Sequence, residues 1–339
     1  ATRFDPDIDL RTKARCPVKN CADQELSQLI RGRQTFPYCK THGLELHPAS
    51  NTFVYHNGDD VESRRRARLR NFRFHQRFIE RHVLDNPHKA ETDRLGHENS
   101  EDALSWNVFV PLLETHRLGA ALRWLLREHM AAVTEEPKLY LWGSEVDLSA
   151  DRFEPFELLG KARKVFEPDI RRFPTEPDIM LITNSLLVCI EAKLTSGNPL
   201  SQEVAGTDAG EKPKSRSGLI EKYAKRWPTS EQHVRHAELE TGMLHSQLFR
   251  NVIFASWMAQ ATRPTRDWHV VNLVSTTQWR LRATAADKGY DFNDPSSAVR
   301  RYLQPAYQRH FTWCSWEGLY EHVVRGQAGL EPLARYLEG

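Results

Sequence analysis

Several motifs that mark large enzyme classes are missing from this sequence. It has no glycine-rich loop ending in Lys-Ser or Lys-Thr, no Gly-x-Gly-x-x-Gly fingerprint and no Gly-x-Ser-x-Gly elbow. An ATP-driven step would therefore need a partner protein. The sequence also lacks a long apolar run, and its mean hydropathy is −0.61, so we expect no membrane insertion and a cytoplasmic location.

A strong excess of one charge is also missing. The chain has 47 lysines and arginines against 45 aspartates and glutamates, and a net charge of +2 does not identify a nucleic-acid-binding protein. Positive charge is concentrated between residues 64 and 81, where arginines alternate with phenylalanines and acids are few. We expect one helix here that buries its phenylalanines, with Arg64, Arg65 and Arg68 binding backbone phosphates. A solvated helix face paired with local acids is the alternative.

Cysteine is scarce, and three of the five cysteines lie near the start of the sequence beside histidines. Cys16 and Cys21 form one close pair, and Cys39 and His42 form another, which is a ligand set suited to tetrahedral Zn²⁺. His47 is the alternative fourth ligand, and free thiols are the alternative to a metal site. The odd number of cysteines argues against a disulfide framework.

Residues 1–58 contain few large apolar side chains. A zinc-ribbon-like module in this region would therefore depend on the metal for its stability. Such a module could contact nucleic acid or serve only as a structural staple, and the sequence favours neither role.

Two carboxylates and an amine accompany two short apolar runs in the middle of the chain. Residues 176–178 are Glu-Pro-Asp, residues 179–182 and 186–190 are apolar, and residues 183–185 are typical of a turn. This pattern predicts a β-hairpin that ends in residues 191–193, Glu-Ala-Lys. Because side chains alternate along a strand, Glu191 and Lys193 are expected on one face.

Charged groups at the end of an apolar strand need compensation. A hard cation such as Mg²⁺ or Mn²⁺ could provide it, with oxygen ligands from Asp178, Glu191 and the Ala192 carbonyl. The cation would activate a water and neutralise a scissile phosphate, while Lys193 would hold the nucleophile or stabilise negative charge. An ordinary solvated strand end is the alternative.

The Pro177-Asp178 pair followed by residues 191–193 resembles the PD-(D/E)XK nuclease superfamily, which has the restriction-endonuclease-like fold. The resemblance covers the middle of the chain and implies an α/β protein with an αβββαβ core. Some relatives carry a glutamine on the helix after the lysine strand. Gln247 and Arg250 resemble that arrangement, which implies a contact with a substrate phosphate, although the exposed stripe of a core helix also explains them.

The same resemblance implies an acid on the first core helix, for which residues 99–110 are the candidate. Glu101 is the preferred residue, ahead of Glu98, Asp102 and Glu114. Acids in a first helical turn are also explained by the helix dipole. This alternative therefore stays open.

The remaining segments complete the expected organisation. We expect strands at 139–148 and 268–274 and a helix at 246–259, while residues 195–218 form a long loop that could close over a nucleic acid. The expected domains are a zinc-binding module, an arginine-rich helical connector, a nuclease core and a C-terminal helical extension, over residues 1–58, 59–97, 98–280 and 281–339.

These patterns and the resemblance together predict a Mg²⁺- or Mn²⁺-dependent DNA endonuclease, in a prokaryotic restriction or defence setting that only the resemblance suggests. RNA is a possible substrate, and a homodimer or a partner encoded in the same operon is a possible assembly. The alternatives are a non-catalytic nucleic-acid-binding or assembly protein on a nuclease scaffold, and a nuclease activated only by a partner or signal.

Overall fold

The computed structural model describes residues 15–18, 20–22, 25–31, 34–47, 52–55, 60–85, 93–97, 100–127, 134–170, 174–194, 222–223, 225–227, 230, 232–235, 245–276 and 296–338. The expected loop at 195–218 and Glu98 lie outside these residues. The chain divides into two compact units, residues 1–111 with 326–339, and residues 112–325. No described helix combines the length and the apolar character that a membrane span requires.

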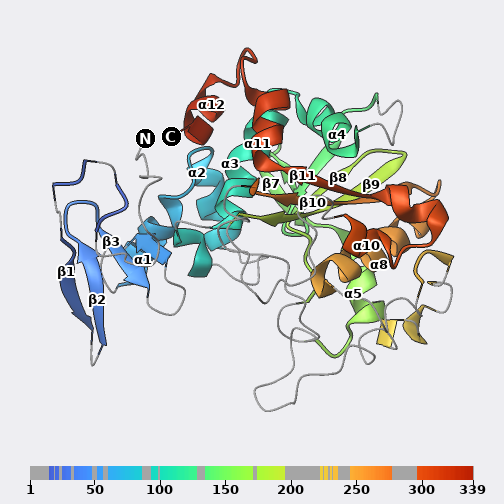
Figure 1. The fold of residues 1–339 in the computed structure, drawn as a ribbon, viewed down its shortest axis with the longest axis horizontal. Helices are drawn as coiled ribbons and strands as arrows, with labels where there is room; N and C mark the ends of the chain where they lie inside the picture. The colour runs from blue at the N-terminus through green and yellow to red at the C-terminus, as the bar shows by residue number, and fades with distance from the viewer. Residues whose placement is uncertain are drawn as a thin grey trace. The chain divides into compact units, whose positions relative to one another are not determined.

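The first unit contains a four-stranded antiparallel sheet in chain order, coloured blue in Figure 1. Its strands are β1 (Ser27–Arg31), β2 (Gln34–Cys39), β3 (Leu44–His47) and β4 (Thr52–Tyr55). The core under this sheet is small, with Cys16, Cys39, Leu44 and Phe53 as its buried members among the described residues. Apolar burial alone therefore gives this sheet little stability.

The helices of the first unit connect this sheet to the rest of the unit. They are α1 (Val61–Leu69), α2 (Gln76–Ile79), the π-helix η1 (Glu80–Leu84), the 3-10 helix η2 (Asp93–Gly96), α3 (Glu101–Glu114), whose last residues belong to the second unit, and α12 (Glu331–Glu338).

The arginine-rich segment is not the single helix that its sequence predicts. α1 and α2 are separated by a break in which His75 adopts a left-handed conformation with φ of 51°. The Gln76 side chain donates to the carbonyls of Leu69 and Phe72, at 3.1 and 2.6 Å, so it satisfies acceptors that the ended helix leaves open. Phe72 is fully buried, as expected for the phenylalanines, and this burial fixes the break.

α3 forms where the sequence predicts a helix, and Asn107 lies fully buried within it. Its Nδ2 donates to the Asn71 carbonyl at 2.7 Å and to the Tyr336 hydroxyl of α12 at 3.1 Å. Its Oδ1 accepts the Arg73 N–H at 2.8 Å. One side chain thus joins the break in the arginine-rich segment to two helices.

The second unit is built on a seven-stranded mixed sheet with the order β11-β10-β9-β8-β5-β6-β7. The strands are β5 (Lys138–Leu141), β6 (Ser144–Asp147), β7 (Arg152–Pro155), β8 (Ile179–Ile182), β9 (Leu186–Lys193), β10 (Asp267–Val274) and β11 (Phe311–Ser315). β9, β10 and β11 are mutually parallel, and the other neighbours are antiparallel. The predicted hairpin of residues 179–193 and the predicted strand at 268–274 are both present.

The expected strand at 139–148 is two strands, because Trp142 and Gly143 turn the chain between β5 and β6. Both residues have positive φ, 52° and 77°, which is the conformation of a two-residue hairpin turn. A Cβ on Gly143 would lie 2.6 Å from Leu159 Cδ2, so a larger residue here would also force the Leu159 side chain to move. The aromatic Trp142 masked this turn signal in the sequence.

The C-terminal region is not entirely helical, contrary to expectation. β11 adds a parallel edge strand to the sheet, with Phe311 paired to Val270 and Ser315 paired to Val274. Its five residues are too short a run to give a clear periodic signal. The strand buries Phe311 and Cys314 against its neighbours.

Helices cover both faces of this sheet (Figure 1). The elements of these layers are α4 (Leu118–Leu126), α5 (Glu157–Phe166), α8 (Ser246–Gln260), α10 (Ser297–Arg300), the 3-10 helix η6 (Pro305–His310), α11 (Trp316–Leu319) and the π-helix η7 (Tyr320–Val324).

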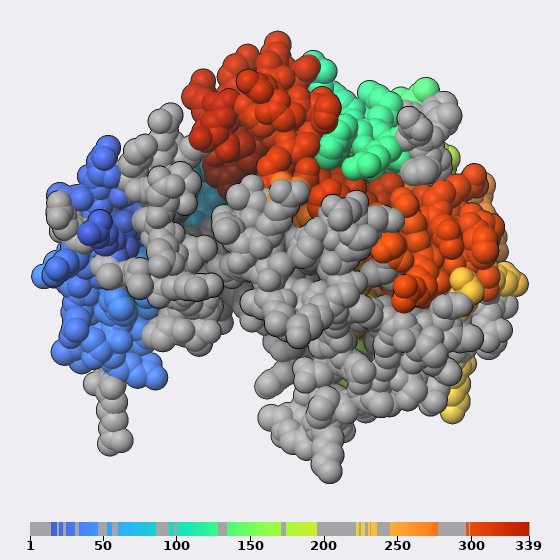
Figure 2. Space-filling model, viewed as in Figure 1, coloured from blue at the N-terminus to red at the C-terminus, as the bar shows by residue number. Residues whose placement is uncertain are grey.

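The two helical layers make different contacts with the sheet. α5, α8 and α10 pack on one face in a large apolar cluster that includes Cys189 and Phe254. On the other face, the Leu125 carbonyl of α4 accepts a hydrogen bond from Thr312 of β11. Trp124 stacks on His322 of η7 with ring centroids 6.0 Å apart, and α4 and η7 are neighbours on the visible surface (Figure 2). The helix α8 that follows the lysine strand is therefore a core helix, as its sequence predicts.

Candidate active site and metal centre

Asp178, Glu191 and Lys193 meet at the end of the β8–β9 hairpin. Asp178 Oδ2 accepts the Ala192 backbone N–H at 2.8 Å, and Lys193 Nζ lies 2.7 Å from Glu191 Oε1. Glu191 is 4% exposed and Lys193 is 6% exposed. These charges therefore do not belong to a solvated strand end, and each must be compensated within the protein.

Strand register explains why these residues share one face. Ile179 pairs with Ile190 across the antiparallel hairpin, which places the preceding Asp178 opposite Glu191. Cys189, two residues before Glu191, lies in the apolar cluster formed with α5 and α8. Because side chains alternate along a strand, Glu191 and Lys193 point to this same helical layer.

α8 contributes a further contact to this cluster. Asn251 Nδ2 donates to Glu191 Oε2 at 2.8 Å, and Asn251 is 2% exposed. The two carboxylate oxygens of Glu191 thus have different partners, the Lys193 ammonium and the Asn251 amide. Asn251 could not be predicted from the sequence, because a single polar residue within an apolar helix has no specific spacing signal.

A second buried carboxylate, that of Glu167, lies near α8 and anchors the segment that leads to Asp178. Glu167, at the end of α5, accepts hydrogen bonds from the Thr175 N–H and from the Tyr223 hydroxyl, both at 2.7 Å. Arg250 Nη1 of α8 lies 3.9 Å from Glu167 Oε1. Burial and the Glu167 charge raise the pKa of Tyr223, so its phenol stays protonated and donates.

The donor atoms at the hairpin end fit a hard divalent cation. The Asp178 and Glu191 carboxylates supply oxygen ligands. The Ala192 N–H points to Asp178, and the N–H and C=O of one strand residue point to the same side, so the Ala192 carbonyl also faces the Asp178 side. This set of oxygens suits Mg²⁺ or Mn²⁺, and a neighbouring lysine suits chemistry on a phosphate.

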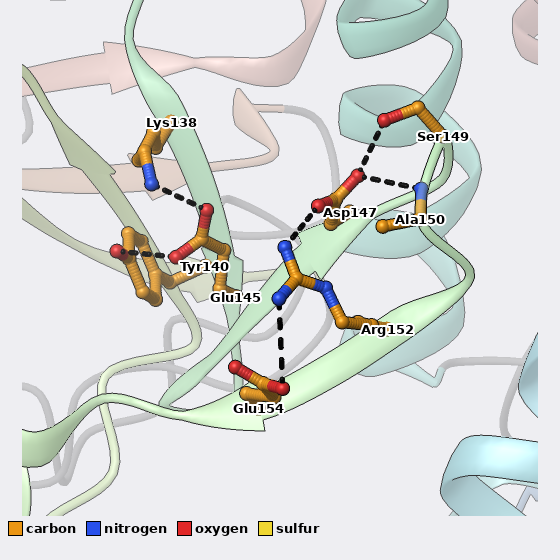
Figure 3. Close-up of polar contacts among 8 residues, drawn as sticks. All are labelled: Lys138, Tyr140, Glu145, Asp147, Ser149, Ala150, Arg152 and Glu154. Carbon is orange, nitrogen blue, oxygen red and sulfur yellow. Dashed lines mark hydrogen bonds and ion pairs between the residues drawn. The ribbon is translucent and has the colours of Figure 1, made fainter.

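The acids of β6 have a structural explanation instead (Figure 3). Glu145 Oε1 lies 2.8 Å from Lys138 Nζ, and Glu145 Oε2 accepts the Tyr140 hydroxyl at 2.9 Å. Asp147 is paired with Arg152 at 2.9 Å and accepts two hydrogen bonds in the turn that follows β6. These acids lie on the half-exposed face, as their alternation with apolar residues predicts.

The other predicted site residues lie in several different elements. Glu101 is the first residue of α3 in the first unit, and Gln247 is a half-buried residue in the first turn of α8. Arg250 is buried and paired with Glu167. Their proposed roles stay predictions.

The arginines of α1 differ from one another. Arg64 is exposed and Arg68 is half-buried. Arg65 lies 3.1 Å from Glu80 and 2.7 Å from Asp85, so local acids do pair with this residue although they are few in the sequence. Phosphate binding by Arg65 would require breaking these ion pairs, and phosphate binding by all three arginines stays a prediction.

The predicted zinc ligands meet in one cluster. The donor atoms of Cys16, Cys21, Cys39 and His42 all lie within 4.8 Å of one another. Each pair of ligands lies at a turn. Asn20, directly before Cys21, has a positive φ of 61°, and residues 40–43, which include His42, form the turn between β2 and β3. The side chain of His47, the alternative ligand, lies outside the described residues.

Distances within the cluster match a tetrahedral ion. The three Sγ atoms lie 3.3 to 3.5 Å from His42 Nδ1, and the Sγ atoms of Cys21 and Cys39 are 3.7 Å apart. Tetrahedral zinc bonds imply about 3.6 Å between sulfur and nitrogen and about 3.8 Å between two sulfurs. Burial raises the pKa of the Cys16 thiol, so a thiolate here needs a cation beside it. This Cys3His cluster could therefore hold Zn²⁺.

Comparison with known proteins gives one family. A family model described as Restriction Endonuclease associating with ARP matches residues 34–338. Asp178, Glu191 and Lys193 lie inside the matched range, whereas Cys16 and Cys21 precede it. No curated protein and no solved structure matches the chain.

Proposed function

Because the chain belongs to the family described as Restriction Endonuclease associating with ARP, we propose that it is a metal-dependent DNA endonuclease with a PD-(D/E)XK site. The single observation that carries this proposal is the cluster of half-buried Asp178 with buried Glu191 and Lys193 at the end of the β8–β9 hairpin. The strands of the αβββαβ core would then lie in the second unit. A role in restriction or defence follows from the family description.

The residues of the cluster have distinct roles in the proposed reaction. Asp178, Glu191 and the Ala192 carbonyl would hold Mg²⁺ or Mn²⁺. The bound cation would stabilise negative charge on the scissile phosphate and make the attacking water more acidic. Lys193 would exchange its contact with Glu191 for one with the attacking water or the phosphate, and Glu101 would assist. Burial strengthens each of these charge interactions.

The substrate contacts are proposed from charge and position. Arg64, Arg68 and Gln247 would bind backbone phosphates, and such contacts carry no sequence information. DNA is preferred to RNA because of the family description, since the metal chemistry serves either backbone. The zinc cluster would stabilise the small sheet of the first unit.

The family description favours a second form of the same proposal, in which the nuclease is active only with an ARP partner. The protein alone would then bind DNA and metal without cutting. A cytoplasmic location stays a prediction.

A cleavage assay tests both forms. Zinc-loaded protein is incubated with supercoiled plasmid, linear duplex, single-stranded DNA and RNA, with Mg²⁺, Mn²⁺ or EDTA, and with or without the ARP partner. Cutting that needs the divalent cation and is lost in Asp178→Asn supports the nuclease, and cutting that appears only with the partner supports the second form. Absence of cutting under every condition by a folded protein, or equal cutting by Asp178→Asn, contradicts the proposal.

A further inference from the structure

The hydrogen bond between Asn251 and Glu191 is unusual in its placement. It joins the interior of a core helix to the charged end of β9, and both residues are less than 5% exposed. A buried amide next to a buried carboxylate must be satisfied by protein groups, since a lost partner costs about 1–3 kcal/mol. This bond therefore belongs to the construction of the site.

The bond restricts the orientation of the carboxylate. Glu191 Oε1 is held by Lys193 at 2.7 Å, and Glu191 Oε2 is held by Asn251 at 2.8 Å. Rotation of the carboxylate would break both contacts at once. The Lys193 contact is an ion pair that a divalent cation could replace. The Asn251 amide is neutral, so a bound cation would not repel it and its hydrogen bond to Glu191 could be kept.

α8 also anchors the Asp178 side of the site. Arg250, adjacent to Asn251, pairs with Glu167, and Glu167 accepts the N–H of Thr175, three residues before Asp178. Neighbouring residues of one helix thus connect to the segments that carry both acids. The β8–β9 register sets the spacing between the two carboxylates, and α8 supports the segments that carry them.

We propose that Asn251 is a positioning residue of the metal site. It holds Glu191 Oε2, and so presents Glu191 Oε1, the oxygen now bound by Lys193, to the divalent cation. This inference rests on the proposed function, because it requires that Asp178 and Glu191 bind such a cation. Partners of this kind, which orient a ligand from outside the coordination sphere, typically contribute about 10- to 100-fold to metal affinity.

Mn²⁺ binding to zinc-loaded protein, measured by calorimetry, tests the inference without relying on cleavage. Asn251→Leu keeps the size of the side chain and removes the donor. Ser256→Ala is the matched control, because Ser256 is a buried polar residue of α8 whose hydrogen bonds stay within the helix. Asp178→Ala identifies the binding that belongs to this site.

We expect Mn²⁺ affinity to fall about 10- to 100-fold in Asn251→Leu and to stay unchanged in Ser256→Ala. If Asn251→Leu does not fold, Asn251→Ser, whose hydroxyl is too short to reach Glu191, should show the same loss. In the cleavage assay, the Mn²⁺ concentration that gives half the maximal rate should rise, while the rate at saturating Mn²⁺ should be largely kept. A general loss of structure would not keep the rate at saturating Mn²⁺.

The outcomes separate this inference from the proposed function. The positioning role is overturned if a folded Asn251 variant binds Mn²⁺ as tightly as the wild-type protein does, provided that Asp178→Ala abolishes Mn²⁺ binding. The proposed nuclease function is then unaffected. Absence of any Asp178-dependent Mn²⁺ binding by the wild-type protein overturns both.

Discussion

Replacing Cys39 with serine is expected to release zinc and to unfold the small sheet of the first unit. Cys39 is fully buried, and its Sγ lies 3.5 Å from His42 Nδ1 and 3.7 Å from Cys21 Sγ. A serine hydroxyl is a much poorer zinc ligand than a thiolate. The substitution therefore leaves three ligands and an open position.

The magnitude follows from the size of the core under the sheet. Leu44 and Phe53 are its large buried side chains among the described residues, and burying both stabilises the sheet by about 3–6 kcal/mol. Structural zinc contributes about 10–16 kcal/mol of apparent binding free energy in small zinc domains. Metal binding is thus the larger contribution, and its loss outweighs what the apolar contacts provide.

The assay combines zinc content with amide hydrogen exchange. Wild type should carry one zinc per chain, and Cys39→Ser should lose both the zinc and the exchange protection of β2, β3 and β4. Cys314→Ala is the control, because Cys314 is buried in β11 outside the cluster, and it should retain the zinc. Full protection of the sheet in zinc-free protein would refute the reasoning.

Three further predictions concern stability and binding. Asn107→Ala removes the side-chain partner of the Arg73 N–H and the Asn71 carbonyl, so urea unfolding should show a loss of about 1–3 kcal/mol. Burial, with a smaller contribution from His310, lowers the pKa of His233 from 6.5 to about 4. Between these two pKa values the unfolded chain binds one more proton than the folded chain, so the free energy of unfolding falls as the pH decreases from 6.5 to about 4. The difference in unfolding free energy between wild type and His233→Leu should therefore change by about 2 kcal/mol between pH 7 and pH 5, measured by denaturant titration. Arg64→Ala should reduce the slope of log DNA affinity against log salt concentration by about 0.9, as measured by fluorescence anisotropy. Arg65→Ala should change this slope less, because Arg65 is already paired with acids.

Strong local patterns allowed much of the fold to be predicted from the sequence. Apolar runs on both sides of residues 183–185 predicted the β8–β9 hairpin, and alternation placed Glu191 and Lys193 on one face. The two close pairs of zinc ligands also predicted their own cluster. The hairpin residues are separated by a simple turn, and the zinc ligands were recognisable because each close pair has a metal-ligand spacing of its own.

The rest depended on tertiary contacts that have no local signal. The arginine-rich segment has helical propensity throughout, but burial of Phe72 and the carbonyl contacts of Gln76 break it. β11 is short and gains its hydrogen bonds only from β10. Asn251 lies about sixty positions from Glu191 in the chain, and only the packing of α8 on β9 brings them together.

The most direct test of the account is the rate of DNA cleavage by Lys193→Ala in Mg²⁺, under the conditions in which the wild-type protein cuts. Lys138→Ala is the matched control, because Lys138 is an exposed lysine of the same sheet that pairs with Glu145 (Figure 3). We predict that Lys193→Ala loses cleavage by about 100-fold or more while retaining its fold and zinc, and that Lys138→Ala cuts like wild type, since an exposed ion pair contributes little. Equal cutting by wild type and Lys193→Ala would contradict the proposed site.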